Sequence, residues 1–206
     1  IIQTSAVFLP AALSTDPHSL CVRRPPGNKP GSAGNWGIQD QRESLRWVRK
    51  NIAAFGGDPD NVLIFGQSSG GSSVSSHLLM AESWPYFDKA IIESGSFPGW
   101  GTHSWEAAET NYRKVTEGTG CDATSGFATE EQQIACLVSA DASEVVAAGG
   151  NVGLPCRDGC NWAPVLDGVE LPDWPMSMLQ SGQRAMDKPL IQLHCNDDGA
   201  GYTYMD

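Results

Sequence analysis

The feature that most constrains the fold is a "GQSSG" segment at residues 66–70, which directly follows the short apolar run "NVLIF". An apolar run of this length is typical of a strand buried on both faces of a sheet. After the segment, Val74, Leu78 and Ala81 recur at helical spacing. The G-x-S-x-G pattern therefore lies between a predicted strand and a predicted helix, where a flexible linker is not expected.

A strand-to-helix bend with this pattern is typical of a nucleophilic serine. Ser68 is the nucleophile candidate, and Gly66 and Gly70 are required because a side chain would clash where strand and helix backbones crowd together. The helix N-terminus offers free N–H groups and the positive end of the helix dipole. The backbone N–H of Ser69 is therefore a candidate oxyanion-hole donor. A chance match in a Gly/Ser-rich sequence is the alternative.

A long amphipathic helix is expected before this strand. Asp40 suits its first turn, and Gly56-Gly57 its end. The apolar positions of its stripe are Ile38, Leu45, Val48, Ile52 and Phe55.

Further strands are expected at residues 90–92 and 189–193, and further helices at residues 104–117 and 130–139. Strands that alternate with helices predict an α/β fold with a largely parallel sheet. Residues 14–34, rich in Pro, Gly, Ser and Asn, are expected to form a long surface loop.

The chain is acidic, with a net charge of -11 over 206 residues and a pI near 4.6. This balance disfavours a nucleic-acid partner, because phosphate binding needs clustered Lys and Arg. No apolar run in the sequence is long enough to predict a membrane span. The length fits one domain with a sizeable core.

The six cysteines favour disulfides, and hence a secretory compartment, over a metal site. Cys156 and Cys160 form a C-x-x-x-C pair with no second cluster, which is a poor zinc site. The partners of Cys21, Cys156, Cys160 and Cys195 stay open at this stage.

The segment "GNWGIQDQRESLRWVRKNIAAFGGDPDNVLIFGQSSGGSSVSSHLL" resembles the type-B carboxylesterase family, which includes the cholinesterases. "FDKAIIESGS" and "APVLDGVELPDWP" are similar to later family segments, in the family's order. The resemblance implies an α/β-hydrolase fold, with a mostly parallel central sheet flanked by helices. It also implies that residues 1–206 are an internal fragment of one such domain.

Members of this family carry a serine, an acid and a histidine in that chain order. In "PLIQLHCNDDGAGY" the resemblance places Asp198 at the acid position, where the family usually has Glu. The alternative is an ordinary acidic turn. His194 and the three earlier histidines all precede Asp198. The catalytic histidine and the glycine-rich oxyanion segment are therefore expected outside this chain, and the fragment alone is expected to be inactive.

The resemblance implies roles for further residues. Gln67 stands where the family usually has a buried Glu, which argues against a specialist for choline esters. Ser94 resembles a serine that supports the triad, and Trp100 an aromatic residue of the acyl pocket, with a core tryptophan as the alternative. Cys121 and Cys136 match a family disulfide.

The function that follows is hydrolysis of small-molecule carboxylic esters by the parent protein, through an acyl-serine intermediate and with no metal or organic cofactor. Two alternatives remain open. One is a non-catalytic adhesion or binding domain on the same fold, and the other is an inactive truncated product.

Overall fold

The structure is a computed structural model. It describes the backbone of residues 5–8 and, with their side chains, residues 35–95, 97, 101–150, 162–185 and 187–198. The chain divides into two compact units, which are taken one at a time. The first draws on residues 1–12, 37–101 and 173–206, and the second on residues 13–36 and 102–172.

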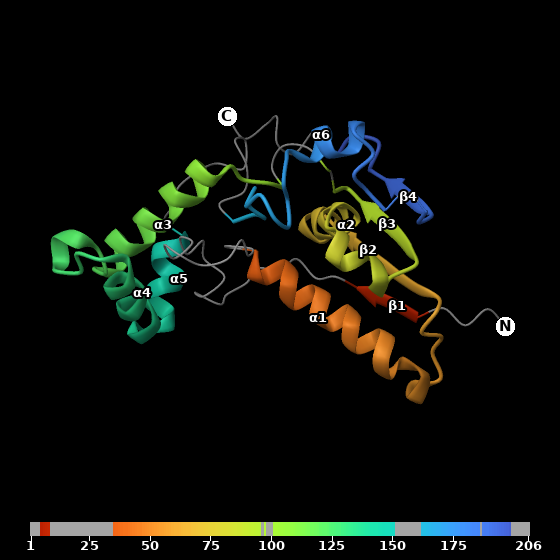
Figure 1. Cartoon of the computed structure of the whole chain (residues 1–206), viewed down its shortest axis with the longest axis horizontal. Coiled ribbons are helices and arrows are strands. Elements are labelled where there is room, and N and C mark those ends of the chain that lie inside the picture. The colour runs from red at the N-terminus through yellow and green to blue at the C-terminus, as the bar shows by residue number, and fades with distance from the viewer. Residues whose placement is uncertain are drawn as a thin grey trace. The chain divides into compact units, whose positions relative to one another are not determined.

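The first unit contains a four-stranded sheet in the order β1-β2-β3-β4, and every neighbouring pair is parallel (Figure 1). The α/β fold with a parallel sheet is thus confirmed. The strands are β1 (Ser5–Phe8), β2 (Val62–Gln67), β3 (Lys89–Glu93) and β4 (Leu190–Leu193). The helices are α1 (Trp36–Asn51), η2 (Ile52–Phe55), α2 (Ser69–Leu79), η3 (Ala81–Tyr86) and α6 (Pro175–Gln180).

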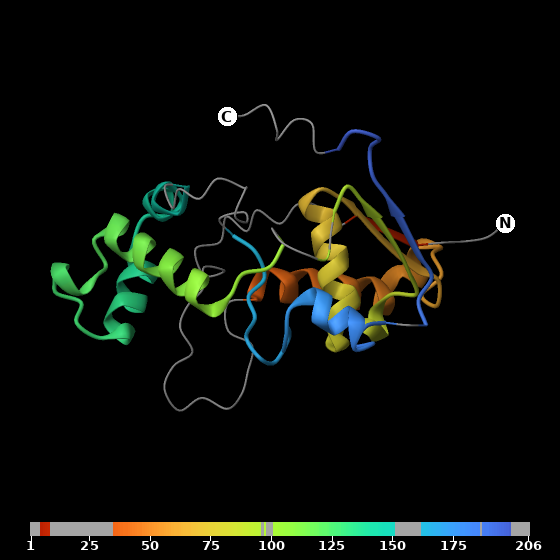
Figure 2. The same ribbon diagram turned by 90° about the horizontal axis from the view of Figure 1, so that it is seen from above.

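The core of this unit lies between the sheet and α2, which packs against β2 and β3 (Figures 1 and 2). Val62 and Ile64 of β2 are fully buried, as are Val74 of α2 and Ile92 of β3. The prediction that β2 is buried on both faces is wrong. Its alternate residues, such as Leu63, are only half-buried, so one face of the strand carries the core.

The long amphipathic helix is present, but its limits differ from the prediction. α1 begins at Trp36, so Asp40 is not in its first turn. After Asn51 the chain tightens into the 3₁₀ turn η2, which ends at Gly56 with a φ of 81°. Because a 3₁₀ turn has three residues per turn, Phe55 leaves the predicted apolar stripe and is 72% exposed. The buried face of α1 instead includes the polar Gln41 and Arg42.

The second unit is helical in its described part, with α3 (Trp105–Thr119), η4 (Ala123–Ser125), α4 (Glu130–Ser139) and α5 (Ala142–Gly150). The helices predicted at residues 104–117 and 130–139 are confirmed. Ser104 caps α3, and a capping box of Thr129 and Gln132 begins α4. The core of the unit comprises Tyr112, Val115, Cys121, Leu137, Val145 and Ala148.

Cys121 and Cys136 form the disulfide that the family resemblance implies, with their Cα atoms 5.5 Å apart. The bond joins the chain just after α3 to α4, inside the core of the second unit. Cys195 is a free, exposed thiol. Cys21, Cys156, Cys160 and the loop predicted at residues 14–34 lie outside the described residues.

Candidate active site

Ser68 stands at the bend between β2 and α2, with a φ of 56° and a ψ of -122°. A positive φ at a non-glycine residue costs roughly 1–3 kcal/mol, so the surrounding structure must hold it. The Ser68 N–H donates to the carbonyl of Glu93 at 2.9 Å, and its own carbonyl accepts from the N–H of Ser72 at 3.0 Å. Within the described residues the Ser68 hydroxyl makes no capping bond to α2. This is the strand-to-helix bend that the sequence predicts, and its backbone is strained at Ser68.

The glycines at the bend allow a very close approach of backbones. A Cβ atom on Gly66 would lie 2.5 Å from the carbonyl carbon of Gly70, which confirms the predicted crowding. A second approach was not predicted: a Cβ on Gly95 would lie 2.6 Å from the Cα of Gly71. The signal for it is a glycine shortly after the next strand, in "ESG". The start of α2 therefore packs directly against the backbone at the ends of both β2 and β3.

α2 begins at Ser69, immediately after the nucleophile candidate. The first N–H groups of a helix have no intrahelical acceptor, and they carry the positive end of the helix dipole. The bend thus places the Ser68 hydroxyl beside donors suited to a developing oxyanion.

Three predicted site residues follow three neighbouring parallel strands. Ser68 follows β2, Ser94 follows β3, and Asp198 lies in an exposed turn after β4. The carboxyl ends of parallel strands meet at one edge of a sheet, which is where ligands bind in open α/β sheets. Ser94 has a φ of 46°, and its N–H donates to the carbonyl of Leu193 at 2.8 Å, so the bend after β3 is tied to β4.

The sequence matches the model of the carboxylesterase family over residues 28–206, and this range includes the strained serine turn. The chain belongs to the carboxylesterase family. Its parallel sheet and flanking helices are accordingly part of an α/β-hydrolase fold.

Three relatives illustrate the similarity. A cholinesterase of Mus musculus is 38% identical over 180 residues, which cover 86% of this chain and 29% of the relative. An acetylcholinesterase of Danio rerio is 36% identical over 82% of this chain and 26% of the relative. An acetylcholinesterase of Electrophorus electricus is 37% identical over 80% of this chain and 26% of the relative. This carboxylesterase-family chain therefore spans less than a third of the length of these relatives.

Gln67 is the last residue of β2, and its side chain is exposed. Trp100 lies outside the described residues, so its predicted place in an acyl pocket stays a prediction.

The histidines of this carboxylesterase-family chain have different surroundings. His77 is fully buried in the first unit. Burial, with the nearby charge of Arg42, lowers the pKa of His77 to about 3, so its ring is neutral at physiological pH. His194 is exposed, and its Nδ1 lies 3.0 Å from the carbonyl oxygen of Cys195. No hydrogen bond joins Ser68 to a histidine within the described residues, and His18 lies outside them.

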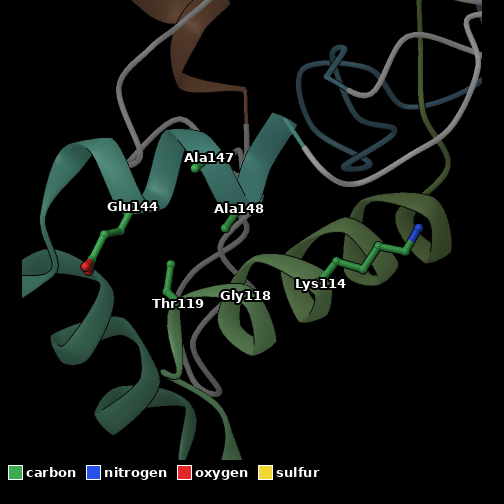
Figure 3. Close-up of a pocket in the computed structure, with 6 residues that line it drawn as sticks. All are labelled: Lys114, Gly118, Thr119, Glu144, Ala147 and Ala148. Carbon is green, nitrogen blue, oxygen red and sulfur yellow. The ribbon is translucent and has the colours of Figure 1, made fainter.

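A hollow of about 360 Å³ lies in the second unit, between α3 and α5 (Figure 3). It is lined by Lys114, Gly118, Thr119, Glu144, Ala147 and Ala148, and so by none of the predicted site residues. The two helices approach closely here: a Cβ added to Gly118 would lie only 2.9 Å from the Cβ of Ala148.

Two properties of the described residues bear on cofactors and membranes. They contain no cluster of His, Cys, Asp and Glu arranged to hold a metal ion. None of the described helices combines the length and the apolar character that a membrane crossing requires.

Proposed function

We propose that the full-length protein hydrolyses carboxylic esters, with Ser68 as the nucleophile. The observation that carries this proposal is the backbone of Ser68, strained between a parallel strand and a helix N-terminus. Membership of the carboxylesterase family supports it. The intact nucleophile also favours an enzyme over an adhesion or binding domain on the same fold.

The proposed reaction runs through an acyl-serine. The Oγ of Ser68 attacks the ester carbonyl, while a histidine base takes the hydroxyl proton and then gives it to the leaving alcohol. The N–H of Ser69 donates to the tetrahedral oxyanion. Water then attacks the acyl-serine with the same histidine as base, which frees the acid and restores the Ser68 hydroxyl.

Asp198 is proposed to orient that histidine, because it follows a strand at the same edge of the sheet as Ser68. The histidine itself is expected from a part of the protein outside residues 1–206, since the family order places it after the acid. We further propose that Ser94 supports the triad and that Trp100 lines the acyl pocket. These residues, with an oxyanion segment from outside the chain, would form part of one α/β-hydrolase domain.

The substrate is proposed to be a small-molecule ester without a required positive charge, because Gln67 lacks the charge of the usual glutamate. The Cys121–Cys136 disulfide fits a protein made in the secretory pathway, which we propose as its location.

Hydrolysis of p-nitrophenyl butyrate by the full-length protein tests the proposed reaction. We expect Ser68→Ala to lower kcat by at least about 10³-fold, because the members of a triad act as a unit. Ser75→Ala is the matched control, since Ser75 lies on the same helix and its hydroxyl donates to the carbonyl of Gly71. Equal turnover by Ser68→Ala and by the control would contradict the assignment.

A further inference from the structure

A continuous chain of polar side chains crosses the buried contact between α1 and α2. This buried chain of hydrogen bonds, or buried chain for short, connects the following groups in order: Arg42, Ser83, His77, Gln41, Ser73 and the backbone carbonyl of Ser69. Each of its side chains is at most 7% exposed. The nucleophile reaction as described uses none of these side chains, although the buried chain ends on the residue next to Ser68.

The backbone carbonyl at one end of the buried chain fixes the direction of the hydrogen bonds as far as His77. At one end, the only hydroxyl proton of Ser73 points to the carbonyl oxygen of Ser69, 3.1 Å away, which can only accept. Ser73 Oγ must therefore accept from the amide Nε2 of Gln41, at 3.2 Å. This turns Gln41 Oε1 toward His77 Nε2, at 3.1 Å, so that ring nitrogen must carry a proton.

The hydrogen bonds at the other end are consistent with the same protonation state. The Nε–H of Arg42 can only donate, and it lies 2.9 Å from Ser83 Oγ. The Ser83 hydroxyl proton is then available to donate to Nδ1 of His77, which is also 2.9 Å away. With Nε2 protonated, the neutral His77 ring accepts at Nδ1, and the Ser83 hydroxyl is its donor.

We propose that the buried chain positions the nucleophile turn, by anchoring the peptide that follows Ser69 to α1. The proposal rests on the function proposed above for Ser68. A strained φ persists only where the surroundings over-determine it. The glycine contacts hold one side of the turn against the sheet. The buried chain holds the other side, and it restricts the rotation of Ser69 that would redirect its N–H.

The direction of the buried chain also strengthens its last bond. Hydrogen bonds that run one way polarise one another, and this chain starts at a guanidinium ion in a low-dielectric interior. The polarised carbonyl of Ser69 belongs to the same peptide as the N–H of Gly70, in the first turn of α2. The buried chain thus acts on the donor end of this helix without touching substrate, and its members are positioning residues.

Ser73→Ala and Ser76→Ala in the full-length protein form a matched pair. Both serines are buried on α2, and both bond the carbonyl four residues earlier, at 3.1 Å and 3.0 Å. Only Ser73 belongs to the buried chain. We expect Ser73→Ala to lower kcat roughly 10- to 100-fold with little change in KM, as for a small misplacement of a reacting group. Ser76→Ala should keep the wild-type kcat at a similar loss of melting temperature. Equal kcat values for the two variants would overturn the proposal.

Two substitutions of His77 distinguish a positioning role from a merely structural one, because they differ in whether the hydrogen bond to Gln41 can be kept. The amide nitrogen of His77→Gln can replace Nε2 as donor to Gln41, whereas the shorter His77→Asn cannot reach it. We expect His77→Gln to recover most of the kcat that His77→Asn loses. Equal kcat values for these two variants would contradict the directed chain.

The tautomer of His77 can be measured without relying on turnover. In ¹⁵N-histidine-labelled full-length protein, the His77 signal, assigned by its loss in His77→Gln, should show a neutral ring protonated on Nε2 from about pH 5 to about pH 8. A ring protonated on Nδ1, or one that titrates near pH 6.5, would overturn the buried chain even if the alanine variants fail to fold. If instead a fluorophosphonate leaves Ser68 of the wild type unlabelled, the proposed function fails while the tautomer result still stands.

Discussion

At the scale of single residues, small side chains and one strained backbone position make the nucleophile turn possible. Ser68 and the need for Gly66 could be predicted, because a strand, a G-x-S-x-G pattern and a helix follow one another in the sequence. The surroundings of His77 could not. Gln41 lies 36 residues from it in the sequence, and Ser83 lies beyond the end of α2, so no helical periodicity indicates either contact.

Gly66→Ala is expected to destabilise the full-length protein by about 1–3 kcal/mol, because a new Cβ would overlap the backbone of Gly70 and the two elements would have to separate. Gly150→Ala is the control, since no atom of the described residues lies within 4 Å of a Cβ there, at the end of α5. Urea unfolding followed by circular dichroism measures both. A change below about 0.5 kcal/mol for Gly66→Ala would show that the close approach is not real.

His77 predicts a dependence of stability on pH. Its pKa is about 3 in the folded protein and near 6.5 when unfolded, so only the unfolded state binds a proton between these values. The free energy of unfolding should therefore fall as the pH drops from 6.5 towards 3, by up to about 1.4 kcal/mol per pH unit from this group. Arg42 is the charged side chain that faces the ring through Ser83. Urea midpoints of wild type and His77→Gln should converge as the pH falls; parallel curves would refute the lowered pKa.

At the scale of elements, prediction succeeded where capping signals and periodicity agree. α4 begins at the Thr129 capping box and matches its predicted range. α5 was missed because its short sequence, "ASEVVAAGG", is nearly apolar throughout and lacks a clear polar face. The prediction extended α1 too far, because the apolar residues Ile52 and Phe55 fit the helical stripe in the sequence. In the structure they belong to the 3₁₀ turn η2, which has a different number of residues per turn.

The disulfide between Cys121 and Cys136 is expected to stabilise the fold. Replacing both Cys121 and Cys136 by serine should lower the free energy of unfolding by about 3 kcal/mol, as the chain-entropy model gives for a loop of this length. Cys195→Ser should leave it unchanged, because that thiol is exposed and unbonded. Differential unfolding in urea, with and without a reductant, measures the effect. An unchanged midpoint for the double variant would contradict a stabilising role.

At the scale of the whole molecule, the α/β class and the parallel sheet followed from the order of strands and helices. The exposure of β4 did not, because an apolar run such as "LIQL" indicates burial. In this chain Ile191 and Leu193 of β4 remain 54% and 50% exposed. Local sequence predicts a strand at this position, but it does not show which elements would cover the strand.

The most direct test of the central claim is to treat the full-length protein with a fluorophosphonate and map the modified residue by mass spectrometry. The account predicts one adduct on Ser68, formed in step with the loss of esterase activity and absent from Ser68→Ala. Activity that is lost through an adduct on another residue, or that persists after Ser68 is fully modified, would contradict it.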